Sequence, residues 1–216
     1  MVRREILYAM LEIEGPDPEV WAGPIFIHVP KAAGSSILAT GVKSTPGHKP
    51  LSFYLRHRPK GVKMPVTFAV VRHPVDRYIS AFYFLRGGGI NPQDAHWAAR
   101  HIPPEMDHNA FAERLAERPD YLRQLHLQPQ APMLTDGAGN IAVDHVLRIE
   151  SLRADWPAFA EAHGLAPDLP EKNTGAAHPG GRPPPTTERC LEILRRVYAA
   201  DFAKLGYTGE SAAKTP

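Results

Sequence analysis

Two short runs of uninterrupted apolar residues restrict the possible fold more than any other feature of the chain. Residues 25–29 and 66–71 both lack the polar alternation of a strand that has one face in water. The first run leads into the small residues 32–36 and the second into Pro74, and both are typical of a turn that starts a helix. Strands covered on both faces and followed by helices predict an α/β protein with a central parallel sheet flanked by helices.

Caps, turns and glycines predict the remaining elements. They place a short helical piece at residues 51–56, a helix between Pro74 and Gly87, a helix at 109–117 capped by Asp107, a third apolar strand at 143–149 and a helix at 156–163. One last helix, capped by Thr186 or Thr187, is expected to carry an apolar stripe of Leu191, Leu194, Val197, Tyr198 and Phe202. Residues 90–106 are expected to be irregular.

Length and charge limit the organisation and the partners. A chain of 216 residues is expected to form one main domain, here residues 23–208, with a peripheral segment 1–22 and a flexible tail 209–216. The net charge is only +2, so a broad nucleic-acid-binding surface is not expected. Any preference for anions must therefore come from a local pocket.

The cysteine count and the first residues of the sequence indicate the cellular compartment in which the protein is expected. Cys190 is the single cysteine, so no intrachain disulfide can form, which favours the reducing cytoplasm. The opening MVRREILYAML is too charged, and its apolar run too short, for a signal peptide or membrane anchor. No transmembrane segment is expected.

The segment HVPKAAGSS at residues 28–36 has the composition of an anion cradle. Lys31 supplies a positive charge, Ala32, Ala33 and Gly34 let an anion approach the backbone, and Ser35 and Ser36 add hydroxyl donors. The ATP-binding P-loop has its lysine after the glycine-rich turn, whereas here the lysine comes first. The alternative is a tight strand–helix turn with an exposed lysine.

A second basic group follows the second apolar run, in VVRHPVDRYIS. Arg72 comes directly after the strand, where open α/β sheets bind ligands. Ser80 lies two helical turns further on, within about 80° of the direction of Arg72. The pair is suited to a second phosphate, although an ion pair between Arg72 and Asp76 would explain the arginine without a ligand. Arg77 is expected on the surface or behind the site.

Together, HVPKAAGSSI and VVRHPVDRYISAFYF resemble the paired signature of sulfotransferases that use 3′-phosphoadenosine 5′-phosphosulfate (PAPS). The carbohydrate branch, with the heparan sulfate 2-O-sulfotransferases and their short bacterial relatives, is the most similar. Further segments that resemble this branch are HLQPQ at 126–130, VDHVLRIESL at 143–152 and YAADFAKLGY at 198–207. Ala32-Ala33 departs from the Thr-Gly of many members, at positions that act through the backbone.

The resemblance implies a three-layer, P-loop-like fold related to nucleotide kinases. It implies that residues 31–36 hold the 5′-phosphosulfate and that Arg72 and Ser80 hold the 3′-phosphate of PAPS and of its product PAP. Arg182, in the late glycine-rich loop GAAHPGGRPPP, is expected to help hold the 3′-phosphate, or else to be a solvated arginine in a connector.

Sulfuryl transfer to a hydroxyl also requires a general base, and a histidine has a suitable pKa. The segment GHKPLSFY at 47–54 resembles the Gly-His segment that carries the base in heparan-type relatives, which indicates His48, with His57 as the second candidate. His28 is expected to pack behind the site, and His126 either to line the cleft or to serve structure. The other histidines expected on the surface are His96, His101, His108 and His163. No metal is expected, because the spacing of His96 and His101 matches no known zinc site.

The prediction from sequence is a PAPS-dependent O-sulfotransferase in which Lys31 and His48 are catalytic. Its acceptor is expected to be a glycan, a glycoconjugate or a small hydroxylated molecule. Two alternatives remain: a small P-loop kinase that uses ATP and Mg²⁺, and a nucleotide- or glycan-binding module without turnover. Neither the acceptor nor the oligomeric state follows from the sequence.

Overall fold

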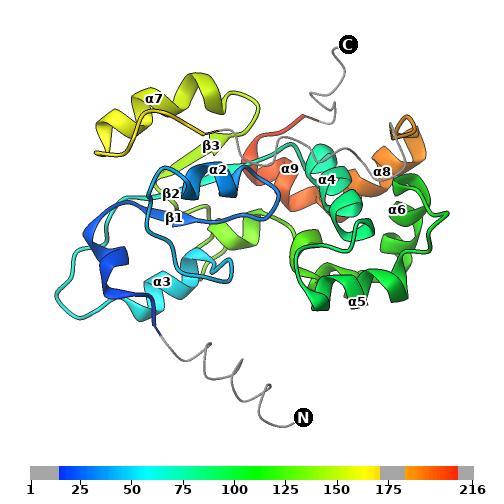
Figure 1. The fold of residues 1–216 in the computed structure, drawn as a ribbon, viewed down its shortest axis with the longest axis horizontal. Helices are drawn as coiled ribbons and strands as arrows, with labels where there is room; N and C mark the ends of the chain where they lie inside the picture. Colours follow the sequence, from blue (N-terminus) through cyan, green and yellow to red (C-terminus); the bar gives the residue numbers. More distant parts are fainter. Residues whose placement is uncertain (1–14, 171–182, 209–216) are drawn as a thin grey trace, which may run out of the picture.

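The computed structural model describes residues 15–170 and 183–208 (Figure 1). Its centre is a sheet of three strands, β1 (Ile25–Ile27), β2 (Thr67–Val71) and β3 (His145–Arg148), in the order β1-β2-β3. Both pairs are parallel, with Ile25 opposite Thr67 and Phe68 opposite His145. All three strands therefore end at the same edge of the sheet, and the predicted α/β class with a parallel sheet is confirmed.

The first two strands have the predicted environment and the third does not. Every residue of β1 and β2 is buried, in keeping with their uninterrupted apolar sequences. β3 is shorter than the predicted 143–149, and its residues are mostly exposed. The prediction of a third apolar strand was wrong in this respect, because β3 carries the polar residues His145 and Arg148.

Helices on either side of the sheet complete a first hydrophobic core (Figure 1). They are α2 (Gly34–Leu38), α3 (Leu51–His57) and α7 (Leu152–Ala162). From these helices Ile37, Tyr54 and Trp156 are buried against the strands. Val20, from the short 3-10 helix η1 (Pro18–Ala22), belongs to the same core.

The remaining helices form a second core, beside the sheet in Figure 1. These are α4 (Pro74–Arg86), α5 (Pro92–His101), α6 (His108–Glu117), α8 (Glu188–Val197) and α9 (Ala199–Leu205). Three 3-10 turns, η2 (Pro119–Arg123), η3 (Leu125–Leu127) and η4 (Ala131–Leu134), connect this part to β3. His108, expected on the surface, is fully buried here, 3.3 Å from the Tyr83 hydroxyl.

Two predicted segments differ from the structure. Residues 90–106 are not irregular throughout, because α5 begins there with Asn91, whose side chain accepts from the backbone N–H of Asp94. The single last helix is two helices, which meet at Tyr198. The predicted cap is correct, since the Thr187 hydroxyl accepts from the N–H of Cys190. Leu191, Val197 and Phe202 of the predicted stripe are only half-buried.

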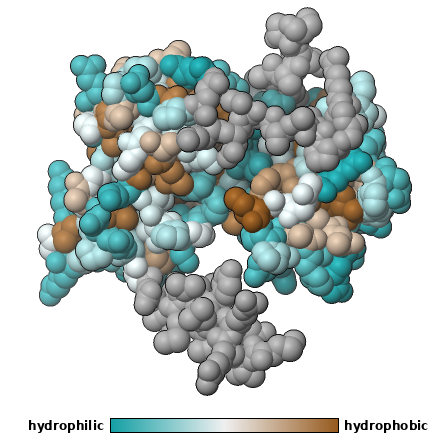
Figure 2. Space-filling view, viewed as in Figure 1, coloured by the Kyte–Doolittle hydropathy of each residue, from teal (hydrophilic) through white to brown (hydrophobic). Residues whose placement is uncertain are grey.

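The surface is hollowed between the sheet part and the helical part, as Figure 2 shows. β2 runs directly into α4, so Arg72 and His73 lie at the junction of the two parts. This junction is at the carboxyl edge of the sheet, where ligands bind in open α/β proteins.

Candidate active site

The turn after β1 has an unusual backbone. Lys31, Ala33 and His48, with φ of 67°, 58° and 52°, are the non-glycine residues with positive φ in the described part of the chain. A left-handed conformation at such residues costs on the order of 1–3 kcal/mol each and is concentrated at functional sites. All three positions belong to the site predicted from sequence, so the strain and the predicted chemistry coincide.

Gly34 is required by the packing of His28. A Cβ built on Gly34 would lie 1.7 Å from Nε2 of His28, so the imidazole rests directly on the glycine backbone. Burial, with the neighbouring His48 and His126 as smaller contributions, lowers the pKa of His28 to about 3, so this ring is neutral at pH 7. As predicted, His28 packs behind the turn, and it also fixes the path of the backbone there.

We expect Gly34→Ala to destabilise the protein by about 1–3 kcal/mol, because the methyl group must displace the His28 ring toward His48. Urea unfolding measures the change. Gly23→Ala is the matched control, since nothing lies within 4 Å of a Cβ at Gly23. Equal unfolding midpoints for the two variants would contradict the packing described here.

His48 is held against the turn by a backbone hydrogen bond. Its Nδ1 lies 2.9 Å from the carbonyl oxygen of His28, and the two rings are 4.0 Å apart between centroids. Because a carbonyl can only accept, Nδ1 must carry the proton, and Nε2 of the neutral ring is left with a lone pair. Burial lowers the pKa of His48 despite the opposing backbone hydrogen bond, so the neutral form prevails at pH 7.

His57, the second candidate, has a different environment. Its Nδ1 lies 2.8 Å from the carbonyl of Phe53 in its own helix α3, and its ring packs on the Phe53 ring at 4.3 Å. The structure therefore brings His48, and not His57, against the turn that carries Lys31.

Lys31 and Arg72 are two half-buried cations that lie close enough to repel each other. The Lys31 ammonium lies 3.8 Å from the centroid of the Phe84 ring. Burial and the charge of Arg72 lower the pKa of Lys31 to about 8, and burial also lowers the pKa of Arg72. Among the described residues, neither has a carboxylate within ion-pair distance. The nearby carboxylates of Asp76 and Glu150 favour the charged form of Arg72.

Gln130 fixes the backbone of Arg72. The Gln130 side chain accepts from the Arg72 N–H at 3.0 Å and donates to the Arg72 carbonyl at 2.8 Å. The backbone N–H groups of Gln130 and Ala131 in turn donate to the carboxylate of Asp201 in α9, at 2.9 and 2.8 Å. The position of Arg72 therefore depends on a helix near the end of the chain.

The backbone of His73 is also held by a side chain from a distant part of the sequence. Its N–H donates to Glu150 at 2.6 Å, and Glu150 also accepts from the hydroxyl of Tyr207 at 3.1 Å. The segments VDHVLRIESL and YAADFAKLGY thus meet at the end of β2 through side chains that sequence reasoning had not singled out.

Arg77 is not a surface residue. It is fully buried and donates to the backbone carbonyls of His126, at 3.1 Å, and of Gln128. Its guanidinium also lies 5.6 Å from the Tyr198 ring centroid. Arg77 therefore holds the HLQPQ segment against α4, close to the predicted site.

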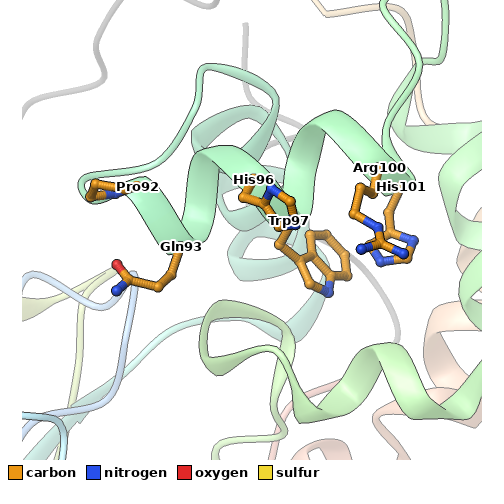
Figure 3. A pocket seen from close by; sticks show the side chains of 6 residues that line it. All are labelled: Pro92, Gln93, His96, Trp97, Arg100 and His101. Carbon is orange, nitrogen blue, oxygen red and sulfur yellow. The ribbon is translucent and has the colours of Figure 1, made fainter. Parts of the chain in front are cut away.

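A pocket of about 290 Å³ opens beside His48. It is lined by His48, Pro50, Gln128, Pro129, Pro132 and Met133. A second, more open hollow of about 390 Å³ lies along one helix, α5 (Figure 3), where Gln93, His96, Trp97 and Arg100 contribute side chains. Only the first pocket contacts a residue of the predicted site.

Residues 15–170 and 183–208 contain no group of three or more His, Cys, Asp or Glu side chains arranged to hold a metal ion. None of their helices has the length and apolar character needed to cross a bilayer.

Comparison with known families agrees with this geometry. The model of the sulfotransferase family matches residues 25–208, from the first strand to the end of α9 and the residues after it. The chain belongs to the sulfotransferase family. No curated protein matches it.

In this sulfotransferase, most of the predicted site residues lie around the end of β1 and β2. Ser80 is half-buried in α4, the helix that also supplies Phe84. Arg182 lies outside the described residues. Three buried residues were missed from sequence: Asp94, Gln130 and Asp201. Gln130 lies in the HLQPQ motif and Asp201 in YAADFAKLGY. The motifs therefore included these two residues but did not indicate what their side chains do.

Proposed function

We propose that this sulfotransferase transfers a sulfuryl group from PAPS to a hydroxyl group of a carbohydrate, a glycoconjugate or a small hydroxylated molecule. The observation that carries the proposal is the pair of half-buried, mutually repelling cations Lys31 and Arg72, which follow adjacent strands. Two such cations without carboxylate partners among the described residues favour a ligand with two anionic groups.

PAPS fits these residues, because it carries anionic groups at both the 5′ and the 3′ position. Lys31, with the turn of small residues Ala32 to Ser36, would hold the 5′-phosphosulfate. Arg72 and Ser80 would hold the 3′-phosphate, and an arginine is suited to it by its planar fork of donors. The proposal extends to Arg182 as a further contact to that phosphate.

Each catalytic task has a suitable residue. PAPS, when bound, supplies the activated sulfuryl group. His48, with its proton on Nδ1, can accept the proton of the acceptor hydroxyl at Nε2. Lys31 can offset the charge that develops on the leaving oxygen, in a site where burial strengthens the interaction.

The pocket beside His48 is proposed to receive the acceptor. Three prolines and Met133 give it apolar walls, while Gln128 and His48 supply polar groups for hydroxyls. The resemblance to the carbohydrate branch supports a sugar or a sugar conjugate. The single cysteine supports a cytoplasmic setting for this domain, which we place at residues 23–208 with 209–216 as a tail.

Calorimetric titration tests the nucleotide. We expect adenosine 3′,5′-bisphosphate to bind at least tenfold more tightly than AMP, because only the former has a group for Arg72, and the affinity should not depend on Mg²⁺. The matched control is Arg123→Ala, an arginine of η2 away from the end of β2, which should bind like the wild type, whereas Arg72→Ala should not. Preference for ATP with Mg²⁺ would instead support the kinase alternative and overturn the proposal.

A further inference from the structure

Asp94 is a buried carboxylate that none of the sequence motifs explains. It lies in the first turn of α5 and is 5% exposed. Its oxygens accept from the backbone N–H of Ile90 at 3.3 Å and from the side-chain amides of Asn91 and Gln124 at 3.0 and 2.9 Å. A carboxylate with three such donors has a fixed orientation.

The turn before α5 is shaped around this carboxylate. Gly89 has a φ of +66°, and a Cβ there would lie 2.2 Å from the Cβ of Asp94. The close approach is therefore possible only for glycine. Gly89, which follows α4, thus allows Asp94 to be buried against this turn.

A chain of contacts connects Asp94 to Lys31. Nε2 of His126 lies 3.4 Å from Oδ2 of Asp94, and both side chains are less than 10% exposed. The His126 ring meets the Phe84 ring edge-on, with centroids 4.5 Å apart. The Lys31 ammonium rests on Phe84, 3.8 Å from its centroid. Phe84 is therefore in contact with both His126 and Lys31.

The charged and titratable groups around Lys31 differ in their effect on the protonation of its ammonium. Arg72, from the end of β2, disfavours the Lys31 cation, and His126 from η3 would oppose it too if it were protonated. Burial lowers the pKa of His126 to about 4, so that ring is neutral at pH 7, as is His48 beside it. Among the described residues, Asp94 is the carboxylate that favours the charged form of Lys31.

We propose that Asp94 is a positioning residue for Lys31. It orients His126, whose ring fixes Phe84 beneath the Lys31 ammonium, and its negative charge keeps that ammonium protonated. This inference rests on the role proposed above for Lys31 and adds to it the residue that maintains the catalytic charge.

The test is an NMR titration of the full chain without nucleotide, after reductive ¹³C-dimethylation of its lysines. The Lys31 signal is assigned by its loss in Lys31→Arg. We expect Asp94→Asn to lower the Lys31 midpoint by about one pH unit, the effect of losing one nearby opposite charge. Glu105→Gln, which removes an exposed carboxylate soon after α5, should leave it unchanged. An unchanged midpoint in Asp94→Asn would overturn the proposal.

Turnover provides an independent readout. A one-unit shift of a pKa near 8 leaves Asp94→Asn about fivefold less active than the wild type at pH 8 and nearly as active at pH 6.5. A purely structural defect would lower activity equally at both pH values, and that result would count against the assignment.

The coupling between Asp94 and Lys31 can also be tested without a variant, and independently of nucleotide binding. Should Asp94→Asn not fold, the wild type itself is used: the ¹³Cγ shift of Asp94 is expected to change at the Lys31 midpoint, and a flat titration curve would refute the coupling. The NMR experiments contain no nucleotide, so failure of PAP to bind would contradict the proposed function without changing their outcome.

Discussion

Replacing Lys31 by alanine is expected to lower kcat by roughly 10²–10³-fold, the usual effect of removing one group that stabilises charge in a transition state. Alanine retains a Cβ, so the strained φ of 67° is the same in both proteins and the backbone is not a cause of the loss. Single-turnover assays with PAPS and a responsive acceptor measure the effect. The affinity for PAP should fall much less than kcat, because the variant retains Arg72, the residue proposed to bind the 3′-phosphate.

Lys43→Ala is the matched control for this variant. Lys43 follows the same helix α2, but its side chain is 65% exposed and pairs with Glu19 at 2.9 Å. We expect its activity to equal that of the wild type. The pH profile adds a second criterion: wild-type activity should decline as the pH rises through the Lys31 pKa of about 8, and Lys31→Ala should lack this decline. Retention of full activity in Lys31→Ala would refute its catalytic role.

Replacing His48 by asparagine is expected to lower kcat by roughly 10²–10⁴-fold, the range for loss of a general base. Asparagine tolerates the positive φ of 52°, and its amide can donate to the His28 carbonyl as Nδ1 of the imidazole does. The variant therefore loses the free ring nitrogen while the turn is preserved. Binding of PAP, measured by calorimetry, should remain within about twofold of the wild type.

His57→Asn serves as the control, because His57 binds a carbonyl of its own helix and packs on Phe53. It should retain most of the activity. A base is active when neutral, so wild-type activity should fall as the pH decreases through the His48 pKa, which burial places below 6.5. If His57→Asn were the inactive variant and His48→Asn the active one, the assignment of the base would be reversed.

The sequence was sufficient to predict the fold class and the turn of small residues, for a physical reason. Strands β1 and β2 are buried on both faces, so their apolar runs needed no knowledge of neighbours to be recognised. β3 was misjudged because Asp144 and His145 stand within a run that was treated as apolar throughout. The start of α5 was missed because Asn91-Pro92 was interpreted as a turn, although the same pair caps a helix.

For the site, the sequence identified the residues of the motifs and not those that support them. The positive φ of His48 and its bond to the His28 carbonyl depend on contacts across 20 positions of the chain. Of the two places considered for Arg77, the structure excludes the surface, and nothing local in the sequence shows that two carbonyls from the HLQPQ segment will bind it. Asp94 is even less visible, since its partner His126 is determined by tertiary packing.

The dependence of Arg72 on Gln130 and Asp201 has a consequence for the order of events during synthesis. The ribosome releases β2 long before it has made α9, so the nascent sheet can form while Arg72 still lacks the support that reaches it through Gln130. The growing chain therefore completes the 3′-phosphate site proposed at Arg72 only when α9 docks. Nucleotide can then stabilise only finished molecules, and any chain interrupted before residue 201 remains without that protection.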